Sequence, residues 1–204
     1  MNPGQPPAFT LLELMVVIAI AAMLTIAAVP AFNAITRGSQ LTQAGQLLTD
    51  ELALARQAAL TRNRAVEVRL YRCPARDARH YRAIQSFVID DDTGRAVATG
   101  RARFLPAGVI IDAGSELSPL LQPERAKTAW TDADPQLPLP DLGTDYDARV
   151  FRFQSDGTTN LTITAQWFLT LHHATLGDNL GALPNNYYVI QINPLNGSVQ
   201  TYRP

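Results

Sequence analysis

The sequence has one cysteine, one lysine and few charged residues. Charged side chains make up 17% of its 204 residues, below the roughly 25% usual for a soluble domain. The single cysteine, Cys73, excludes a disulfide within the chain, and its strand-like surroundings predict a half-buried structural thiol. The length allows about one domain, with room for an appendage.

Motifs for cofactor, metal and catalytic chemistry are missing as well. The sequence has no Cys-x-x-Cys, no His-Glu-x-x-His and no histidine and cysteine set with the spacing of metal ligands. It also lacks a nucleophile–base pair, a phosphate-cradling loop and a carboxylate dyad. These absences predict a protein that is not an enzyme and uses no metal or cofactor. The net charge of −1 argues against nucleic-acid binding through bulk charge.

Charge is distributed unevenly along the chain. The first 36 residues carry one charged side chain, Glu13, whereas residues 37–103 have an excess of five basic residues and residues 104–204 an excess of five acidic ones. This division suits contacts between copies or with related subunits. A run of seven arginines predicts a patch for an anionic partner: Arg62, Arg64, Arg69, Arg72, Arg76, Arg79 and Arg82. Lipid headgroups, the acidic half of another subunit or DNA phosphates would each fit such a patch.

The longest apolar run starts at Leu11 and reads LLELMVVIAIAAMLTIAAVP. Twenty helical residues rise about 30 Å, the thickness of the hydrocarbon core of a bilayer. Pro30 would remove a backbone hydrogen bond and kink the helix. Apolar residues then recur at spacings of three and four, at Leu41, Ala44, Leu48, Leu52, Ala55 and Ala59, which predicts one amphipathic stripe. We expect a long helix over residues 10–61, with an apolar membrane half and a half that lies on a globular domain.

Glu13 is the unexpected residue of the apolar run. A carboxylate in a membrane helix costs roughly 2.5–3.5 kcal/mol on insertion scales. One interpretation places it at the helix N-terminus, where the dipole favours it and the side chain reaches the interface. The other gives it a cationic partner, since ionisable residues inside membranes are usually functional. Residue chemistry alone leaves both interpretations open.

The segment from Ala8 to Glu13, followed by the apolar run, closely resembles the processing signal of type IV prepilins and type II secretion pseudopilins. The resemblance implies that a prepilin peptidase removes a leader, residues 1–8, by cutting before Phe9, and methylates the new amine. It also implies that Glu13 pairs with the N-terminal amine of a neighbouring subunit, which removes an uncompensated buried charge. Pro30 matches the helix proline of that family.

The family resemblance also implies a location and a set of partners. Residues 9–36 would form the transmembrane and filament-core helix of a single-pass protein of the bacterial inner membrane, with its globular domain on the periplasmic side. Its partners would be other pilin or pseudopilin subunits, the prepilin peptidase and inner-membrane lipid. Two features depart from the family: Ala8 stands where glycine is usual, and the leader has no lysine or arginine. The positive-inside rule alone would place the C-terminus in the cytoplasm, but the motif is the more specific signal.

The pattern beyond residue 62 predicts a sheet. Val66, Val68 and Leu70 alternate with polar or amphipathic neighbours, as in a half-buried strand. Further strands are expected at 80–89, near 95–98, at 149–153, at 159–171 and at 187–193 with 198–202, joined by turns at Asp156-Gly157 and Asn196-Gly197. Residues 112–147 have no clear period and predict an irregular insertion with a short helix near 118–127. The predicted class is α+β: a long helix packed on an antiparallel twisted sheet, with residues 37–204 as the globular domain.

Three parts of the chain are similar to minor pseudopilins of the GspH/FimT kind: the second half of the helix, the predicted strand–Asp-Gly–strand at 151–163 and the final hairpin with Gly197. Residues 45–71 also resemble the Verru_Chthon cassette protein D group. These resemblances imply a pilin-like globular domain and a structural subunit of a type IV pilus-like or type II secretion filament. The alternative is a DNA-binding minor pilin for DNA uptake. Such proteins carry a late Gly-Arg-x-Arg motif, whereas this chain reads Gly197-Ser198-Val199-Gln200. Nucleic acid is therefore the less favoured partner.

For most residues of three further groups, the sequence predicts a structural role and no ligand. Asp90, Asp91 and Asp92 are expected in a solvated turn, because three adjacent carboxylates cannot all face one calcium ion. His172 and His173 are neighbours on a predicted strand and therefore point to opposite faces, which makes them poor joint metal ligands. Trp167 is expected in the core, and Trp130 is a candidate interface residue.

Overall fold

The computed structural model describes residues 10–75 and 78–204, including their side chains except those of residues 27–34. The chain divides into two compact units, residues 1–39 and residues 40–204. One helix, α1 (Leu11–Arg62), contributes its first part to one unit and its second part to the other. The predicted boundaries of the long helix, residues 10–61, agree with it to within one residue.

The described part of the first unit, residues 10–39, is Thr10 followed by the first part of α1. Its large apolar side chains lie in the open, from 50% exposed at Val16 to 78% at Leu11. No stretch of the described helical residues meets the combined length and hydropathy of a bilayer span. Residue 9 of the predicted segment 9–36 and the side chain of Pro30 lie outside the described part of the chain. The membrane role and the proline kink therefore stay predictions.

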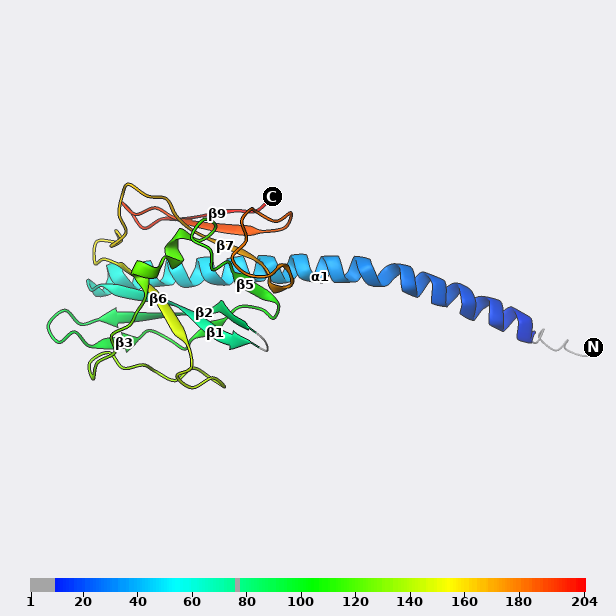
Figure 1. Cartoon of the computed structure of the whole chain (residues 1–204), viewed down its shortest axis with the longest axis horizontal. Helices are drawn as coiled ribbons and strands as arrows, with labels where there is room; N and C mark the ends of the chain where they lie inside the picture. The colour runs from blue at the N-terminus through cyan, green and yellow to red at the C-terminus, as the bar shows by residue number, and fades with distance from the viewer. Residues whose placement is uncertain (1–9, 76–77) are drawn as a thin grey trace, which may run out of the picture. The chain divides into compact units, whose positions relative to one another are not determined.

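The second unit contains one antiparallel sheet in the strand order β6-β1-β2-β5-β7-β8-β9, with β3 and β4 also paired to β2. Figure 1 shows β1, β2 and β3 on one side of the second half of α1 and β7 and β9 on the other. The strands are β1 (Val66–Ala75), β2 (Ala78–Ile89), β3 (Ala96–Ala98), β4 (Arg103–Phe104), β5 (Val109–Ile111), β6 (Asp147–Phe153), β7 (Trp167–His173), β8 (Tyr188–Ile192) and β9 (Val199–Tyr202). The predicted α+β plan of a long helix on an antiparallel sheet is confirmed.

The core of the second unit lies between the helix and the sheet. All six residues of the predicted amphipathic stripe, from Leu41 to Ala59, are buried there. Gly45 belongs to the same face, and a Cβ built on it would come within 2.5 Å of the Tyr188 ring. The ring therefore fills the space that a larger residue would take, and helix and strand β8 approach closely at this point.

Two sequence predictions about the sheet were wrong. Residues 159–166 form turns and irregular structure, and the strand begins only at Trp167. The turn at Asp156-Gly157 does not join two neighbouring strands either, because β6 pairs with β1 while β7 pairs with β5 and β8. A single bridge, Phe153 to Thr159, is all that remains of the expected hairpin.

The irregular insertion, residues 112–147, crosses the outer face of the sheet. In place of the expected short helix it contains two single-turn 3-10 helices, η1 (Pro119–Leu121) and η2 (Pro123–Arg125). Its later part covers β1 and β2 and forms a second, smaller core with them, which includes Tyr71, Cys73, Ala83, Leu139, Tyr146 and Ala148. Strand β1 is consequently buried on both faces rather than half-buried as predicted.

Candidate functional site

The first turn of α1 carries Glu13. The Glu13 backbone N–H donates to Thr10 Oγ1 at 3.2 Å, and the Leu14 N–H donates to the Thr10 carbonyl at 3.1 Å. Thr10 therefore caps the helix, and a glutamate three residues later follows the order of a capping box. A carboxylate in the first turn also meets the positive end of the helix dipole. Local structure thus supports the interpretation that places Glu13 at the helix N-terminus, and its pairing with another subunit stays a prediction.

The helix surface around Glu13 is apolar and open. Leu12, Leu14, Met15 and Val17 flank it, each more than half exposed. Exposed apolar area of this extent is unusual for a monomer in water and typical of a surface that is covered in the functional state. The predicted cleavage and methylation residues, Ala8 and Phe9, lie outside the described residues.

The predicted arginine patch is divided among several environments. Arg64 pairs with Asp90, and Arg79 pairs with Asp145 at 2.7 Å. Arg69 is fully buried and cannot belong to a surface patch. The patch is therefore smaller than the sequence predicts, and two of its members, Arg64 and Arg79, are matched by carboxylates.

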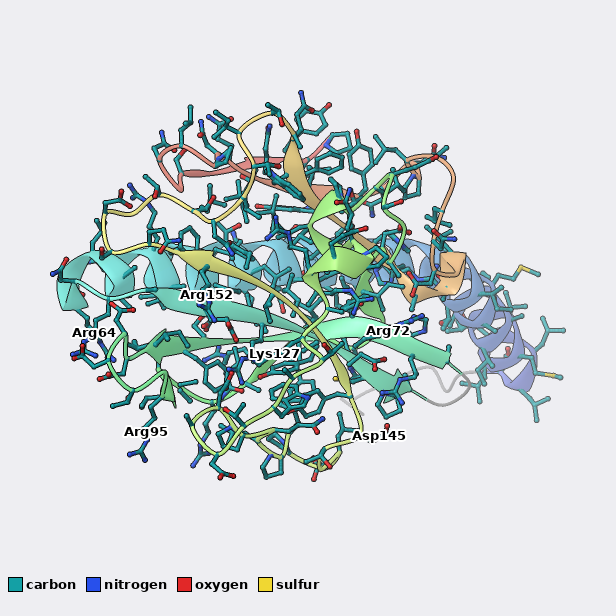
Figure 2. The ribbon with its side chains drawn as sticks, turned by 60° about the vertical axis from the view of Figure 1, so that its left-hand side comes forward. Arg64, Arg72, Arg95, Lys127, Asp145 and Arg152 are labelled. Carbon is teal, nitrogen blue, oxygen red and sulfur yellow. The ribbon has the colours of Figure 1, made fainter. Side chains whose placement is uncertain are left out.

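The remaining members of that patch are scattered. Arg62 is exposed at the end of α1, and Arg82 lies 5.7 Å from the Phe104 ring centroid. Arg72 is half-buried beside Tyr81 and donates from Nε to the Arg79 carbonyl at 3.2 Å. Figure 2 shows Arg64 and Arg72 well apart on the second unit. Arg76 lies outside the described part of the chain.

The division into a basic and an acidic region serves contacts inside the chain. Arg69 and Arg79, from the basic region, pair with Asp134 and Asp145 from the acidic one. Lys127 of the acidic region reaches back to Glu67 at 3.0 Å. Much of the charge that the sequence offers to another subunit is thus matched within residues 40–204.

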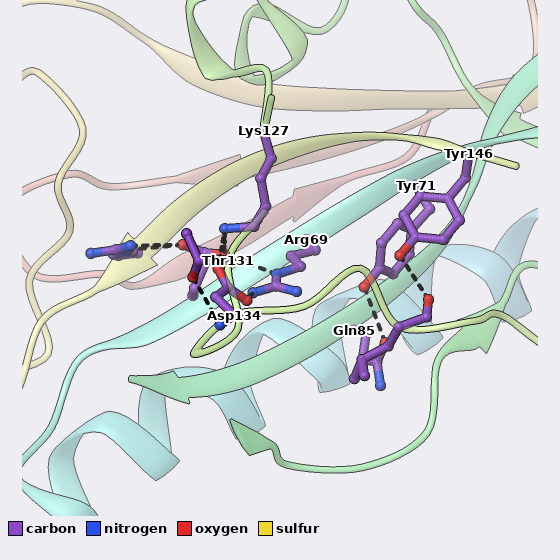
Figure 3. A network of polar contacts seen from close by, with 10 residues as sticks. Arg69, Tyr71, Gln85, Lys127, Thr131, Asp134 and Tyr146 are labelled. Carbon is purple, nitrogen blue, oxygen red and sulfur yellow. Dashed lines mark hydrogen bonds and ion pairs between the residues drawn. The ribbon is translucent and has the colours of Figure 1, made fainter. Parts of the chain in front are cut away.

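An ionic cluster that sequence analysis missed lies between the sheet and the insertion. It consists of Glu67, Arg69, Lys127, Asp134 and Arg152, from β1, the insertion and β6 (Figures 2 and 3). Glu67 accepts from Arg69 Nε at 2.8 Å and from Lys127 Nζ at 3.0 Å on Oε1, and from Arg152 Nη2 at 2.9 Å on Oε2. Asp134 pairs with both Arg69 and Lys127.

Arg69 is the most enclosed member of the ionic cluster. Its guanidinium lies 3.6 Å from the Phe87 ring centroid and 5.4 Å from that of Trp130, so both aromatic side chains are within the range of a cation–π contact. Its Nη1 is buried without a hydrogen-bond partner in the described residues. Trp130, a predicted interface residue, therefore contributes to the packing around an internal charge.

The cluster shifts the pKa values of its carboxyl groups. Burial by itself would raise the pKa of Glu67, but Arg69, Lys127 and Arg152 together outweigh burial and hold the pKa below its ordinary value. The pKa of Asp134 is likewise lowered, because Lys127 and Arg69 overcome the effect of burial. Both side chains are therefore anions at neutral pH, and the cluster carries three positive and two negative charges.

The insertion is also held by hydrogen bonds and aromatic contacts. The Lys127 backbone N–H donates to the Ala148 carbonyl at 3.0 Å. The rings of Tyr71 and Tyr146 meet edge to face, 4.8 Å apart, and the Tyr146 hydroxyl donates to the Leu137 carbonyl at 2.7 Å. Together with the ionic cluster, these contacts fix the insertion on the sheet. The arrangement has a clear structural role.

A second buried pair joins β7 to the start of the insertion. His172 Nε2 lies 3.0 Å from Asp112 Oδ2, and both side chains are fully buried. Asp112 also accepts from the Gly114 and Leu180 backbone N–H groups, at 2.8 and 2.9 Å. The pair therefore anchors two loops. The described residues contain no group of three metal-ligating side chains.

The acidic turn after β2 is a hydrogen-bonded turn. Asp90 Oδ1 accepts from the backbone N–H groups of Asp92 and Thr93, at 3.2 and 3.0 Å. The hydrogen bonds from the Thr93 backbone N–H and hydroxyl, followed by the pairing with Arg64, hold the pKa of Asp90 below its ordinary value. A side-chain oxygen of aspartate that accepts from the backbone two residues later is the pattern of an Asx turn. The contacts therefore agree with the predicted solvated turn.

We expect Cys73 to be unreactive in the folded protein. It is fully buried rather than half-buried, and burial raises the pKa of its thiol to about 11. Since only the thiolate reacts, labelling with iodoacetamide at pH 8 should be on the order of a hundredfold slower than in urea. Quantitative mass spectrometry of the time course measures both rates. Equal rates would contradict the buried position.

The fold and site define a class of protein, an α+β chain in which a long, exposed apolar helix continues into a compact helix-and-sheet unit. No family model matches the chain, and no curated protein matches it. Among solved structures, the minor pseudopilin EpsH of the Vibrio cholerae type 2 secretion system is similar at 12% identity, covering 81% of this chain and 98% of that one with a TM-score of 0.44. The type IV minor pilin FimU of Pseudomonas aeruginosa is similar at 15% identity, covering 83% and 96% with a TM-score of 0.46.

Proposed function

We propose that the protein is a minor pilin or pseudopilin, a structural subunit that assembles with other pilin-like subunits into a type IV pilus-like or type II secretion filament. The observation that carries the proposal is the open apolar surface of α1 with one carboxylate, Glu13, in its first turn. Such a surface requires a cover of lipid or of other helices. Residues 9–36 would lie in the inner membrane before assembly and in the filament core afterwards, with residues 37–204 on the periplasmic side.

The proposal includes processing by a prepilin peptidase. Cleavage between Ala8 and Phe9 would leave Phe9 as the new N-terminus, and methylation would keep its amine cationic while adding one methyl group. The resemblance of residues 8–20 to prepilins supports this step.

We expect intact-mass and N-terminal peptide mass spectrometry to find an N-methylated Phe9. The protein should be purified from membranes of a host that has a prepilin peptidase. An Ala8→Arg variant, which places a large charged side chain at the cut, should keep residues 1–8. An unprocessed N-terminus in the wild-type chain from this host would contradict the proposal.

A DNA-uptake role is the second candidate, and the structure reduces the charge available for it. Of the seven predicted arginines, Arg64, Arg69 and Arg79 are matched by carboxylates. Salt-dependent binding of duplex DNA requires several unpaired cations along one surface. A structural subunit is therefore the better supported function.

A further inference from the structure

The second unit has a groove between one flank of α1 and the end of the sheet. Its volume is about 320 Å³, and its lining is formed by Thr49, Ala53, Arg56, Gln57, Leu60, Gly197, Ser198 and Val199. The helical members recur at spacings of three and four, so they form a single stripe along the groove. Ala53 is exposed and Leu60 is 44% exposed, which leaves apolar helix surface uncovered on this flank. No carboxylate is present in the lining.

Strand β9 forms the other wall, and it is the last strand of the sheet (Figure 1). It pairs with β8, and it has no second strand partner among the described residues. The Asn193 N–H donates to the Ser198 carbonyl at 2.9 Å and the Asn193 carbonyl accepts from the Gly197 N–H at 2.8 Å, so both backbone groups of Asn193 are bonded to the chain that enters β9. Because hydrogen-bonded and non-hydrogen-bonded pairs alternate in an antiparallel ladder, the backbone N–H and C=O groups of Val199 and Thr201 point away from β8.

The opposite edge of the sheet is covered. The Asn160 N–H donates to the Arg152 carbonyl of β6 at 3.0 Å, and the Lys127 N–H donates to the Ala148 carbonyl at 3.0 Å. Proteins commonly protect an open edge with charges, proline or a bulge, but β9 reads Val-Gln-Thr-Tyr and contains neither charge nor proline. An open edge of this kind is a template for another strand.

We propose that the groove and the β9 edge together bind an extended segment of a different protein, which adds to the sheet as a short strand beside β9. Its backbone would bond to Val199 and Thr201, and every second side chain would pack on Ala53 and Leu60 of the helix. Main-chain bonds supply affinity in this mode and the side-chain contacts supply selectivity. Because Arg56 lies in the lining and no carboxylate does, the segment carries apolar or acidic residues rather than lysine or arginine.

The size of the groove favours a segment over a second copy of this chain. The groove admits a few extended residues between helix and edge, whereas the β9 edge of another copy would arrive with its own helix and sheet attached. All the residues involved lie within residues 40–204, so this binding site does not depend on the assembly role of the apolar helix. If a test contradicts segment binding at the β9 edge, the assembly role of the apolar helix is unaffected, and the reverse also holds.

The test uses the full chain in detergent and the peptide acetyl-Ser-Val-Thr-Val-Ser-Asp-amide as the probe. We expect saturable binding by calorimetry and slower hydrogen exchange at the Val199 and Thr201 amides. A matched peptide with alternate backbone nitrogens methylated on its β9-facing side should bind at least about tenfold more weakly. Equal binding of the two peptides, or no saturable binding, would overturn the proposal.

Substitutions locate the site. Thr201→Pro removes an outward N–H, and Ala53→Glu fills the groove, so each should weaken binding about tenfold or more. Thr201→Val keeps the N–H, and Leu54→Glu changes an exposed helix residue outside the groove; both should bind as the wild type does. Unchanged binding in Thr201→Pro would refute an edge-pairing mode. Concentration-dependent dimerisation with protection of the same amides in the absence of peptide would assign the edge to a second copy instead.

Discussion

Glu67→Ala should lower the free energy of unfolding by about 3–5 kcal/mol, the range found when one partner of a buried ion pair is removed. The substitution takes away the carboxylate that Arg69, Lys127 and Arg152 share. It leaves Arg69, which is fully buried, with Asp134 as its remaining anionic partner in the described residues. Chemical denaturation of the detergent-solubilised chain, followed by near-ultraviolet circular dichroism, measures the change.

The matched control for Glu67→Ala is Arg152→Ala in the same cluster. The Arg152 side chain is 43% exposed, so its pairing is screened by solvent and its loss should cost at most about 1 kcal/mol. Glu67→Gln keeps the shape and the acceptor oxygen but not the charge, and should fall between the two. If Glu67→Ala is no more destabilised than Arg152→Ala, the cluster does not hold the insertion on the sheet.

The same cluster gives the protein a sensitivity to acid. The pKa values of Glu67 and Asp134 are lower in the folded chain than their ordinary values. A carboxyl group with a lowered pKa contributes stability above its unfolded pKa and loses that contribution as pH falls through the folded one. The wild type should therefore lose stability below about pH 4.5, and Glu67→Gln should lose less over the same range.

Sequence patterns predicted the helix well because the information for it is local. The spacing of Leu41, Leu48 and Leu52 matches the period of a helix, and all three are buried. The Asn-Gly turn before β9 was recognised for a similar reason: Gly197 has φ +64°, a conformation that favours glycine. A Cβ at this position would also collide with the Gly157 carbonyl. Backbone requirements of this kind are visible in a few consecutive residues.

Partners distant in sequence could not be predicted in the same way. The alternation of residue types in β1 correctly places Leu70 and Arg69 on opposite faces of the strand. It predicts that Arg69 faces solvent, because nothing in that stretch indicates that another segment covers this face. The cover comes from Asp134 and Lys127, about sixty residues later, in an insertion without periodicity. The prediction of a surface patch failed at Arg69 for this reason. A lone lysine and a nearby aspartate in an irregular segment were the only available signal.

Glu13→Gln should abolish incorporation into filaments while leaving membrane insertion intact. The amide keeps the size of the side chain and can still act in a capping box, but it cannot neutralise the cationic N-terminus of a neighbouring subunit. An unpaired amine buried among apolar helices is strongly unfavourable, because desolvation of a charge is compensated only by a close counter-ion. The measurement is the amount of the protein in sheared or purified filaments relative to the amount in membranes.

Thr10→Ala separates the two roles that the first turn combines. It removes the hydroxyl that accepts from the Glu13 N–H and should cost the helix about 1 kcal/mol, yet it keeps the carboxylate. If Glu13 acts through its charge on a neighbouring subunit, Thr10→Ala assembles and Glu13→Gln does not. If Glu13 acts only by capping its own helix, Thr10→Ala is the more damaging substitution and Glu13→Gln assembles normally. Which of the two variants assembles into filaments thus decides whether the Glu13 carboxylate acts within its own helix or between subunits.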